Sequence, residues 1–143
     1  GEKIYEDFFS EMHYRYPDRV GLTIGFVPEL SKKIYAGADM FLMPSQSEPC
    51  GLAQMIALRY GTIPIVRETG GLRDSIHDAG DKNGNGFTFK SYNAHDMLDA
   101  VVRARAYYDD KMKWGRLVNT ALKQNFSWTK SAKDYIALYN DIH

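Results

Sequence analysis

The centre of the chain alternates between short apolar runs and a segment with helical spacing. Met40 to Met43 is an apolar run that ends at Pro44, because proline has no N–H group to donate to a sheet. Residues 51–60 then carry apolar side chains at helical spacing, and Gly61 follows as the glycine that often ends a helix. Ile63 to Val66 is a second apolar run without alternation, which is typical of a parallel strand covered on both faces. The pattern predicts strand, loop, helix and strand in succession.

The flanking sequence adds further elements of both kinds. Residues 70–76 repeat the arrangement, with a glycine turn that leads into a short helix. Apolar residues at helical spacing predict more helices over residues 2–16, 28–37, 93–107, 109–125 and 129–142. Short apolar runs predict further strands over residues 20–24 and 86–89. The expected fold class is therefore α/β, with a Rossmann-like parallel sheet and flanking helices.

Glycines stand where predicted strands are followed by helices. Ligands of open parallel sheets bind beyond the carboxyl ends of the strands, where free N–H groups and the positive end of the helix dipole favour an anion. Gly51, Gly70 and Gly71 would let a phosphate approach the backbone closely. Glu48 lies three residues before this anion site and would repel the anion, so it suits an uncharged or cation-like part of the same ligand, such as a sugar. An anion joined to a sugar indicates a nucleotide sugar.

Several positions of the central stretch form a long and specific motif, unlike a lone glycine pattern. They are Pro44, Ser45, Glu48-Pro-Cys-Gly-Leu52, Gln54, Ala57-Leu-Arg-Tyr-Gly-Thr62, Pro64 and Thr69-Gly-Gly-Leu72. Together they resemble the signature of bacterial glycogen synthases and plant starch synthases, which are retaining glucosyltransferases of the GT-B architecture. The resemblance continues on both sides of the motif, from Tyr16-Pro17 to Phe126-Ser-Trp128 and the helix that follows.

The resemblance implies a reaction and a set of site residues. Glucose would pass from ADP-glucose to the non-reducing end of an α-1,4-glucan with retention at the anomeric carbon, without a metal or another cofactor. Glu48 would be the catalytic residue and would hold a glucose hydroxyl. Phe26 would stack on the adenine, and backbone amides would meet the phosphates. The donor-binding residues implied are Phe26, Cys50, Gly51, Leu52, Gln54, Thr69, Gly70 and Gly71.

Each of these assignments has a structural alternative. Phe26 could be a core residue, and Glu48 could be a carboxylate of a surface loop. Gln54 could meet the ribose or cap the turn. Cys50 could be a reactive thiol beside a helix end or a small buried side chain. Arg67 could reach a phosphate or pair with a carboxylate.

The resemblance also bears on domain organisation. In the enzymes that this chain resembles, a separate N-terminal domain binds the acceptor glucan and supplies half of the catalytic cleft. Residues 1–143 are expected to form a single partial Rossmann-like donor-nucleotide-binding domain without the acceptor domain. This domain matches the C-terminal half of the GT-B architecture, truncated at its N-terminal side. The isolated fragment would therefore be inactive, and the α-glucan acceptor would be bound through the missing domain.

The truncation predicts a gap in the sheet. In the family's sheet order, strands that this chain lacks separate the strand at 20–24 from the strand at 40–43. We expect either a repacked sheet or exposed strand edges. A homodimer could cover those edges or the apolar face of the final helix.

Charge and cysteine content limit which partners the protein could bind and in which compartment we expect it. Basic and acidic residues number 18 each, which argues against a general nucleic-acid or anionic-membrane surface. The only cysteine, Cys50, cannot form an internal disulfide, and no signal peptide or membrane-length apolar run is present. The cytoplasm is therefore the expected location. The histidines stand apart in the sequence, so no metal-ligand cluster is expected.

Two departures from the family pattern and two other functions stay open. Many relatives carry a basic-aromatic pair where this chain has Gln46-Ser47. Retaining transferases of the wider fold often carry a second glutamate at the position of Ile56, so its absence here favours the glycogen and starch synthase branch. The alternatives are a stand-alone nucleotide-binding regulatory module and a fragment of a transferase that uses another nucleotide sugar.

Overall fold

The computed structural model describes residues 2–142 and divides the chain into two units, one up to Ser31 and one from Lys32 onward. The first unit consists of helix α1 (Lys3–Arg15), a segment without regular secondary structure over residues 16–27, and the start of helix α2 (Pro28–Gly37). A ring nitrogen of His13 lies 2.5 Å from the carbonyl oxygen of Val20, and this contact connects the segment to α1.

The strand predicted at residues 20–24 does not form, and this prediction was wrong. The segment has no regular secondary structure, and Ile24 exposes 52% of its surface. A strand exists only where a neighbouring strand accepts and donates its backbone hydrogen bonds. None of the described strands pairs with this segment, so its β-forming side chains have no sheet to join.

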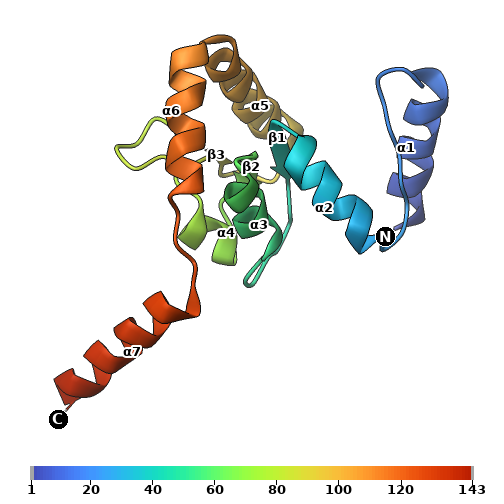
Figure 1. Cartoon of the computed structure of the whole chain (residues 1–143). Coiled ribbons are helices and arrows are strands. Elements are labelled where there is room, and N and C mark those ends of the chain that lie inside the picture. The colour runs from blue at the N-terminus through green and yellow to red at the C-terminus, as the bar shows by residue number, and fades with distance from the viewer. Residues whose placement is uncertain (1, 143) are drawn as a thin grey trace. The chain divides into compact units, whose positions relative to one another are not determined.

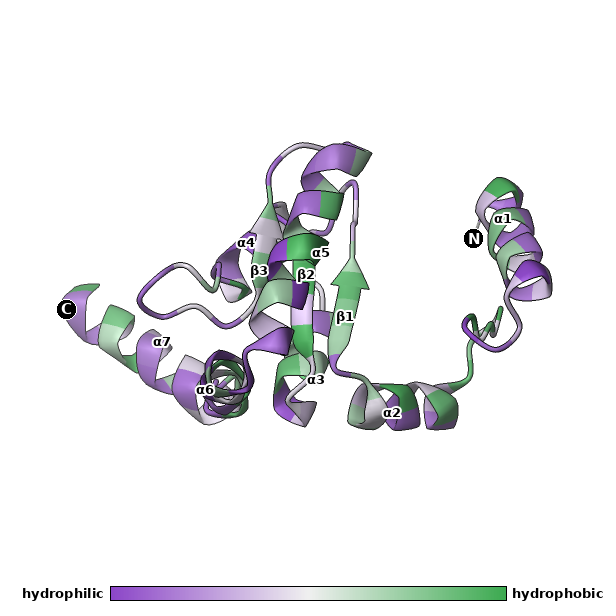
Figure 2. Ribbon diagram, turned by 90° about the horizontal axis from the view of Figure 1, so that it is seen from above, coloured by the Kyte–Doolittle hydropathy of each residue, from purple (hydrophilic) through white to green (hydrophobic). Residues whose placement is uncertain are grey.

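The second unit is built on a three-stranded parallel sheet in the order β1-β2-β3 (Figure 1). The strands are β1 (Met40–Met43), β2 (Ile63–Arg67) and β3 (Phe87–Phe89). Met40 is paired with Ile63, and Ile65 is paired with Phe87. Figure 2 shows β1 as hydrophobic along its length, in agreement with an uninterrupted apolar strand. The predicted α/β class with a parallel sheet and flanking helices is confirmed.

Helices follow each strand and cover the sheet. They are α3 (Ala53–Tyr60), α4 (Gly70–Ser75), α5 (Ala94–Asp109) and α6 (Lys111–Leu122). The final helix, α7 (Trp128–Ile142), follows α6 and has no buried residue. Helix α3 packs on β2 and α6, whereas α5 packs on β3 and α6. The core between them is apolar and consists mainly of Leu58, Ile63, Ile65, Val66, Leu72, Ile76, Phe87, Phe89, Ala100, Ala104, Trp114 and Leu117. Among residues 2–142, no helix has the length and apolar character needed to cross a bilayer.

Local signals set the ends of the central elements. Gly61 has φ +78° and ends α3 in the left-handed conformation, as the sequence predicted. The side chain of Asn93 accepts a hydrogen bond from the Asp96 amide at 2.9 Å and caps α5, and Asp110 caps α6 in the same way. These caps begin and end helices without help from distant residues.

The outer edge of β1 has no strand partner among the described residues. This is the exposed strand edge that the sequence predicted as one consequence of the gap. Helix α7 has no buried residue, and its apolar side chains Tyr135, Ile136, Leu138 and Tyr139 are exposed. The homodimer expected to cover these surfaces stays a prediction.

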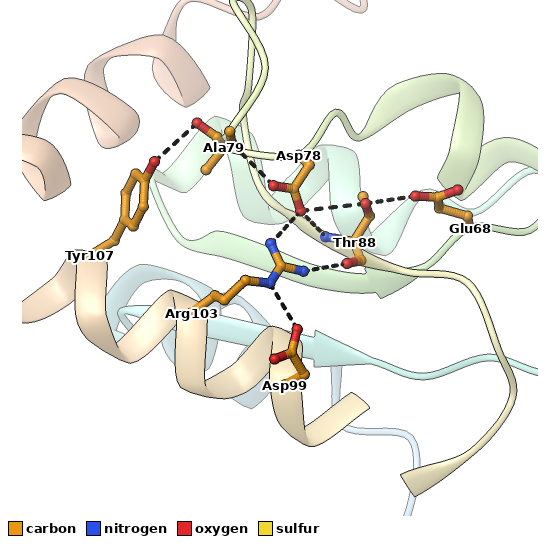
Figure 3. Close-up of polar contacts among 8 residues, drawn as sticks. Glu68, Asp78, Ala79, Thr88, Asp99, Arg103 and Tyr107 are labelled. Carbon is orange, nitrogen blue, oxygen red and sulfur yellow. Dashed lines mark hydrogen bonds and ion pairs between the residues drawn. The ribbon is translucent and has the colours of Figure 1, made fainter. Parts of the chain in front are cut away.

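An ionic cluster fastens the glycine-rich loop of residues 77–86 to the sheet (Figure 3). Arg103 of α5 contacts Asp78 at 2.7 Å and donates to the Thr88 carbonyl of β3 at 2.7 Å. Asp78 also accepts from the Thr88 amide at 2.9 Å and the Gly80 amide at 3.1 Å. Partial burial acts to raise the pKa of Asp78, but the hydrogen bonds from Arg103 and the two amides outweigh burial and lower it. The charged form of Asp78 therefore stabilises the fold.

The cluster predicts an acid-dependent loss of stability. Because the folded pKa of Asp78 lies below its unfolded value, its contribution is present above the unfolded pKa of about 4 and is lost as the pH falls through the folded pKa. Asp78→Asn should lower the free energy of unfolding at pH 7 by about 1 kcal/mol, the lower end for a partly exposed charged hydrogen bond. The variant should also show a smaller difference in the free energy of unfolding between pH 7 and pH 3. Urea unfolding at the two pH values measures this difference.

The matched control is Asp109→Asn, which removes an exposed ion pair with Arg105. This variant should change the free energy of unfolding much less, because exposed pairs are screened by solvent. Equal pH dependence in Asp78→Asn and the wild type would contradict the role given to Asp78.

Candidate functional site

The predicted site residues of the second unit gather at one edge of the sheet. Because β1 and β2 are parallel, their carboxyl ends lie at the same edge. The loop of residues 44–52 follows β1 and leads into α3, while Glu68 and Thr69 follow β2 and lead into α4. Two strand-to-helix turns therefore meet where ligands of open parallel sheets bind.

The two turns touch through their backbones. The Gly71 amide donates to the Glu48 carbonyl at 3.1 Å and to the Pro49 carbonyl at 3.3 Å. A Cβ atom on Gly70 would lie 2.1 Å from the Glu48 oxygen, and one on Gly71 would lie 1.9 Å from the Cys50 oxygen. These glycines are thus required for close approach between two loops, a reason that the sequence pattern did not reveal.

The turn before α3 presents unpaired N–H groups. Gly51 has φ +72°, in the left-handed region, and Leu52 follows at φ −105° and ψ −26°. Neither amide of these two residues has a hydrogen-bond acceptor within residues 2–142. Successive left-handed and right-handed residues orient their N–H groups to form a backbone nest, an anion-binding concavity. The N-terminus of α3 adds its dipole to the same place.

Gln54 is buried directly behind this turn. Its Nε2 atom donates to the Gly51 carbonyl at 2.8 Å and the Cys50 carbonyl at 3.3 Å, and it contacts the Ser75 hydroxyl at 3.1 Å. Ser75 in turn donates to the Gly71 carbonyl at 2.6 Å. The amide of Gln54 is therefore directed at the two turns, which agrees with the turn-capping alternative. Ser75 had no sequence signal, because it lies 21 residues from its partner.

The remaining residues of the first turn differ in exposure. Glu48 is half-buried, and its carboxylate makes no hydrogen bond or ion pair in the part of the chain that the structure describes. The thiol of Cys50 is exposed, and Leu52 exposes 65% of its surface. Thr69 precedes α4 with a half-buried side chain that does not cap the helix.

Arg67 holds the Glu48 loop from the other side. Its guanidinium donates to the Gln46 carbonyl at 2.7 Å and the Lys90 carbonyl at 3.2 Å, and it lies over the Tyr92 ring at 5.6 Å. Of the two roles that the sequence left open, pairing with a carboxylate does not occur among the described residues, and contact with a phosphate stays a prediction. Arg67 instead ties the loop after β1 to the segment after β3.

Phe26 belongs to the first unit, and its side chain is 93% exposed. The core alternative for Phe26 therefore does not hold in this structure. Its stacking on adenine stays a prediction. A hollow of about 540 Å³ in the second unit lies beside the Leu52 turn, and it is lined by Leu52, Met55, Ile56, Arg59, Gln124, Asn125, Phe126 and Ser127.

Comparison with known proteins agrees with an α/β domain of the open parallel-sheet class. The sequence profile of the family described as glycosyl transferases group 1 matches residues 11–116. The chain belongs to this family. Proteins named glycogen synthase from Anoxybacillus flavithermus and Bacillus anthracis are each 54% identical to it over 99% of its length, and one from Desulforudis audaxviator is 52% identical.

Solved structures agree with the sequence comparison. The catalytic domain of starch synthase IV from Arabidopsis thaliana, bound to ADP and acarbose, matches 94% of the chain with a TM-score of 0.82 and 40% identity. Sucrose-phosphate synthase from Thermosynechococcus elongatus matches with a TM-score of 0.69 at 24% identity, which supports the fold alone. The suspected likeness to glycogen and starch synthases and the GT-B assignment are thereby confirmed.

The chain spans only part of these relatives. It covers 30% of the glycogen synthase from Anoxybacillus flavithermus and 29% of the Arabidopsis starch synthase structure. Whether this chain shares the activity, substrates and partners of these longer proteins is therefore left to the proposal below.

The contact between the turns predicts that Gly71→Ala destabilises the fold. The new Cβ would meet the Cys50 carbonyl, so the Glu48 loop must move, at a cost of about 1–3 kcal/mol for an overpacked site. Thermal or urea unfolding measures the change. Gly115→Ala is the matched control, because Gly115 lies in α6 with open space around it and alanine there should stabilise by about 0.4–1 kcal/mol. A Gly71→Ala variant as stable as the wild type would show that the two turns do not touch as described.

Proposed function

We propose that this chain forms part of the donor site of a glycogen (starch) synthase, which transfers glucose from ADP-glucose to an α-1,4-glucan with retention. The proposal rests on one observation, which is that a single loop carries both anion-binding amides and an unpaired carboxylate. The free amides of Gly51 and Leu52 suit a diphosphate, and the unpaired carboxylate of Glu48 lies only three residues before them. The glycogen synthase relatives and the starch synthase structure with bound ADP support the same choice.

Negative charge develops on the ADP phosphate as the glucosyl bond breaks. The amides of Cys50, Gly51 and Leu52 would stabilise this charge from fixed positions, which requires little reorganisation during the reaction. Thr69 and Gly70 would contribute from the second turn. The amide of Gly71 already bonds the Glu48 carbonyl, so Gly71 would act by holding the loop.

Glu48 would face the glucose. Its carboxylate can accept a hydrogen bond from a sugar hydroxyl, and its negative charge favours a cation-like sugar in the transition state. Because the carboxylate has no partner among the described residues, a bound hydroxyl would supply one. The stacking of Phe26 on an adenine stays a proposal that rests on the family resemblance.

In this proposal, residues 1–143 are part of one donor-nucleotide-binding domain. The α-glucan acceptor would contact another domain of the longer protein, as the length of the relatives suggests. The chain alone is therefore expected to bind the donor without transferring glucose. The exposed, unpaired Cys50 suits a reducing compartment such as the cytoplasm.

Calorimetric titration of the chain tests the donor site. We expect ADP to bind in the millimolar range, about −4 kcal/mol, and UDP to bind more weakly. Glu48→Gln should weaken ADP-glucose about tenfold, or about 1.4 kcal/mol, because a neutral amide is a poorer acceptor for a sugar hydroxyl. The same variant should bind ADP no more weakly than the wild type, since a nearby carboxylate repels the diphosphate.

Glu11→Gln, which changes an exposed residue of α1, is the matched control and should behave as the wild type. UDP binding as tight as ADP binding would favour a transferase for another nucleotide sugar. If Glu48→Gln lowers the affinity for ADP and for ADP-glucose by the same factor, Glu48 does not contact the sugar.

A further inference from the structure

We propose that Gln54 is a positioning residue that turns two successive peptide groups so that their N–H groups face the donor diphosphate. Gln54 itself would not touch the ligand, since its side chain is fully buried. This role deepens the proposed function, on which the identity of the ligand as a nucleoside diphosphate rests.

The planarity of the peptide group carries the first step. In a trans peptide, the C=O and N–H bonds point in opposite directions. Gln54 holds the Cys50 carbonyl at 3.3 Å, so the Gly51 N–H on the same peptide points away from Gln54. It also holds the Gly51 carbonyl at 2.8 Å, so the Leu52 N–H points away as well. One buried amide therefore orients two donors outward.

Gly51 and Gln54 are matched to each other. Gly51 has φ +72°, a conformation that residues other than glycine rarely adopt, and with this backbone its carbonyl accepts from Gln54. A Cβ at Gly51 would lie 2.5 Å from Gln54 Oε1, so the amide occupies the space that the glycine leaves free. The outward N–H groups thus depend on both residues.

The same amide connects the first turn to the second. Gln54 contacts the Ser75 hydroxyl at 3.1 Å, and Ser75 donates to the Gly71 carbonyl at 2.6 Å. The Gly71 amide returns to the Glu48 carbonyl. The turn before α3 and the start of α4 are therefore connected by hydrogen bonds through Gln54.

The side-chain oxygen of Gln54 is unpaired, and this bears on how much the residue contributes to stability. Gln54 Oε1 is buried and has no hydrogen-bond partner among the described residues. Such an acceptor is costly, and an apolar side chain of similar size would avoid the cost. This cost offsets part of what the three hydrogen bonds of Nε2 contribute to stability. It follows that Gln54→Met should keep the fold.

Inorganic pyrophosphate is the probe for this role, because it tests the turn without adenine or sugar. Amide NMR spectra of the chain would be recorded during the titration. In the wild type, pyrophosphate should shift the amide signals of Gly51 and Leu52. Gln54→Met should bind pyrophosphate at least tenfold more weakly and lose these two shifts, while its melting temperature stays close to that of the wild type.

Two variants serve as comparisons. Gln124→Met makes the same chemical change at an amide just after α6, which donates to the Thr120 carbonyl near the end of that helix, and it should bind pyrophosphate as the wild type does. Ser75→Ala keeps both carbonyl contacts of Gln54 and should lose less than threefold in affinity. If Gln54 had only a structural role, its replacement would lower the pyrophosphate affinity and the melting temperature together.

Three results would overturn the role of Gln54. They are the same pyrophosphate affinity in Gln54→Met and the wild type, wild-type shifts that do not include Gly51 and Leu52, and an unfolded Gln54→Met variant. A different result bears on the proposed function alone. If pyrophosphate shifts these amides as expected but ADP is not preferred over UDP, the positioning role stands and the ADP-glucose assignment fails.

Discussion

The hydrogen bond from the Gly71 amide to the Glu48 carbonyl is the contact on which the sheet edge depends. It joins the loop after β1 to the start of α4, across a distance that leaves no room for a Cβ atom at either Gly70 or Gly71. Side chains could not bring two loops this close, because they would separate the backbones. This contact holds the backbone at Glu48 beside the start of α4, and the hydrogen bonds of Gln54 then orient the turn that follows.

Side-chain donors take up the carbonyl groups of the surrounding loops. Gln54 bonds two carbonyls of the first turn, Arg67 bonds those of Gln46 and Lys90, and Arg103 bonds that of Thr88. With these acceptors satisfied, the unpaired groups left in the turn before α3 are N–H groups, which bind anions. The same bonds that order the loops therefore also leave this turn with donor groups directed at solvent, as the proposed phosphate contact requires.

Sequence reasoning was most accurate where the signals were local. The strand from Met40 to Met43 has its predicted bounds, and Gly61 ends α3 as expected, because both depend on neighbours along the chain. The strand at residues 20–24 failed because a strand also needs a partner, and no local pattern reports one. The roles of Gln54 and Arg67 were left open for a similar reason, since Ser75, the third partner of Gln54, and the partners of Arg67 all lie more than 20 residues away along the chain.

The sequence by itself determined the α/β class, the family resemblance and the loops that carry the candidate site, because apolar periodicity, glycines and prolines act over a few residues. Only the tertiary structure decided how these loops meet. It showed that Gly70 and Gly71 serve a backbone contact, that Gln54 faces inward, and that Ser75 connects the two turns. Such contacts depend on distances between segments far apart in the chain, and those distances exist only after the sheet has formed.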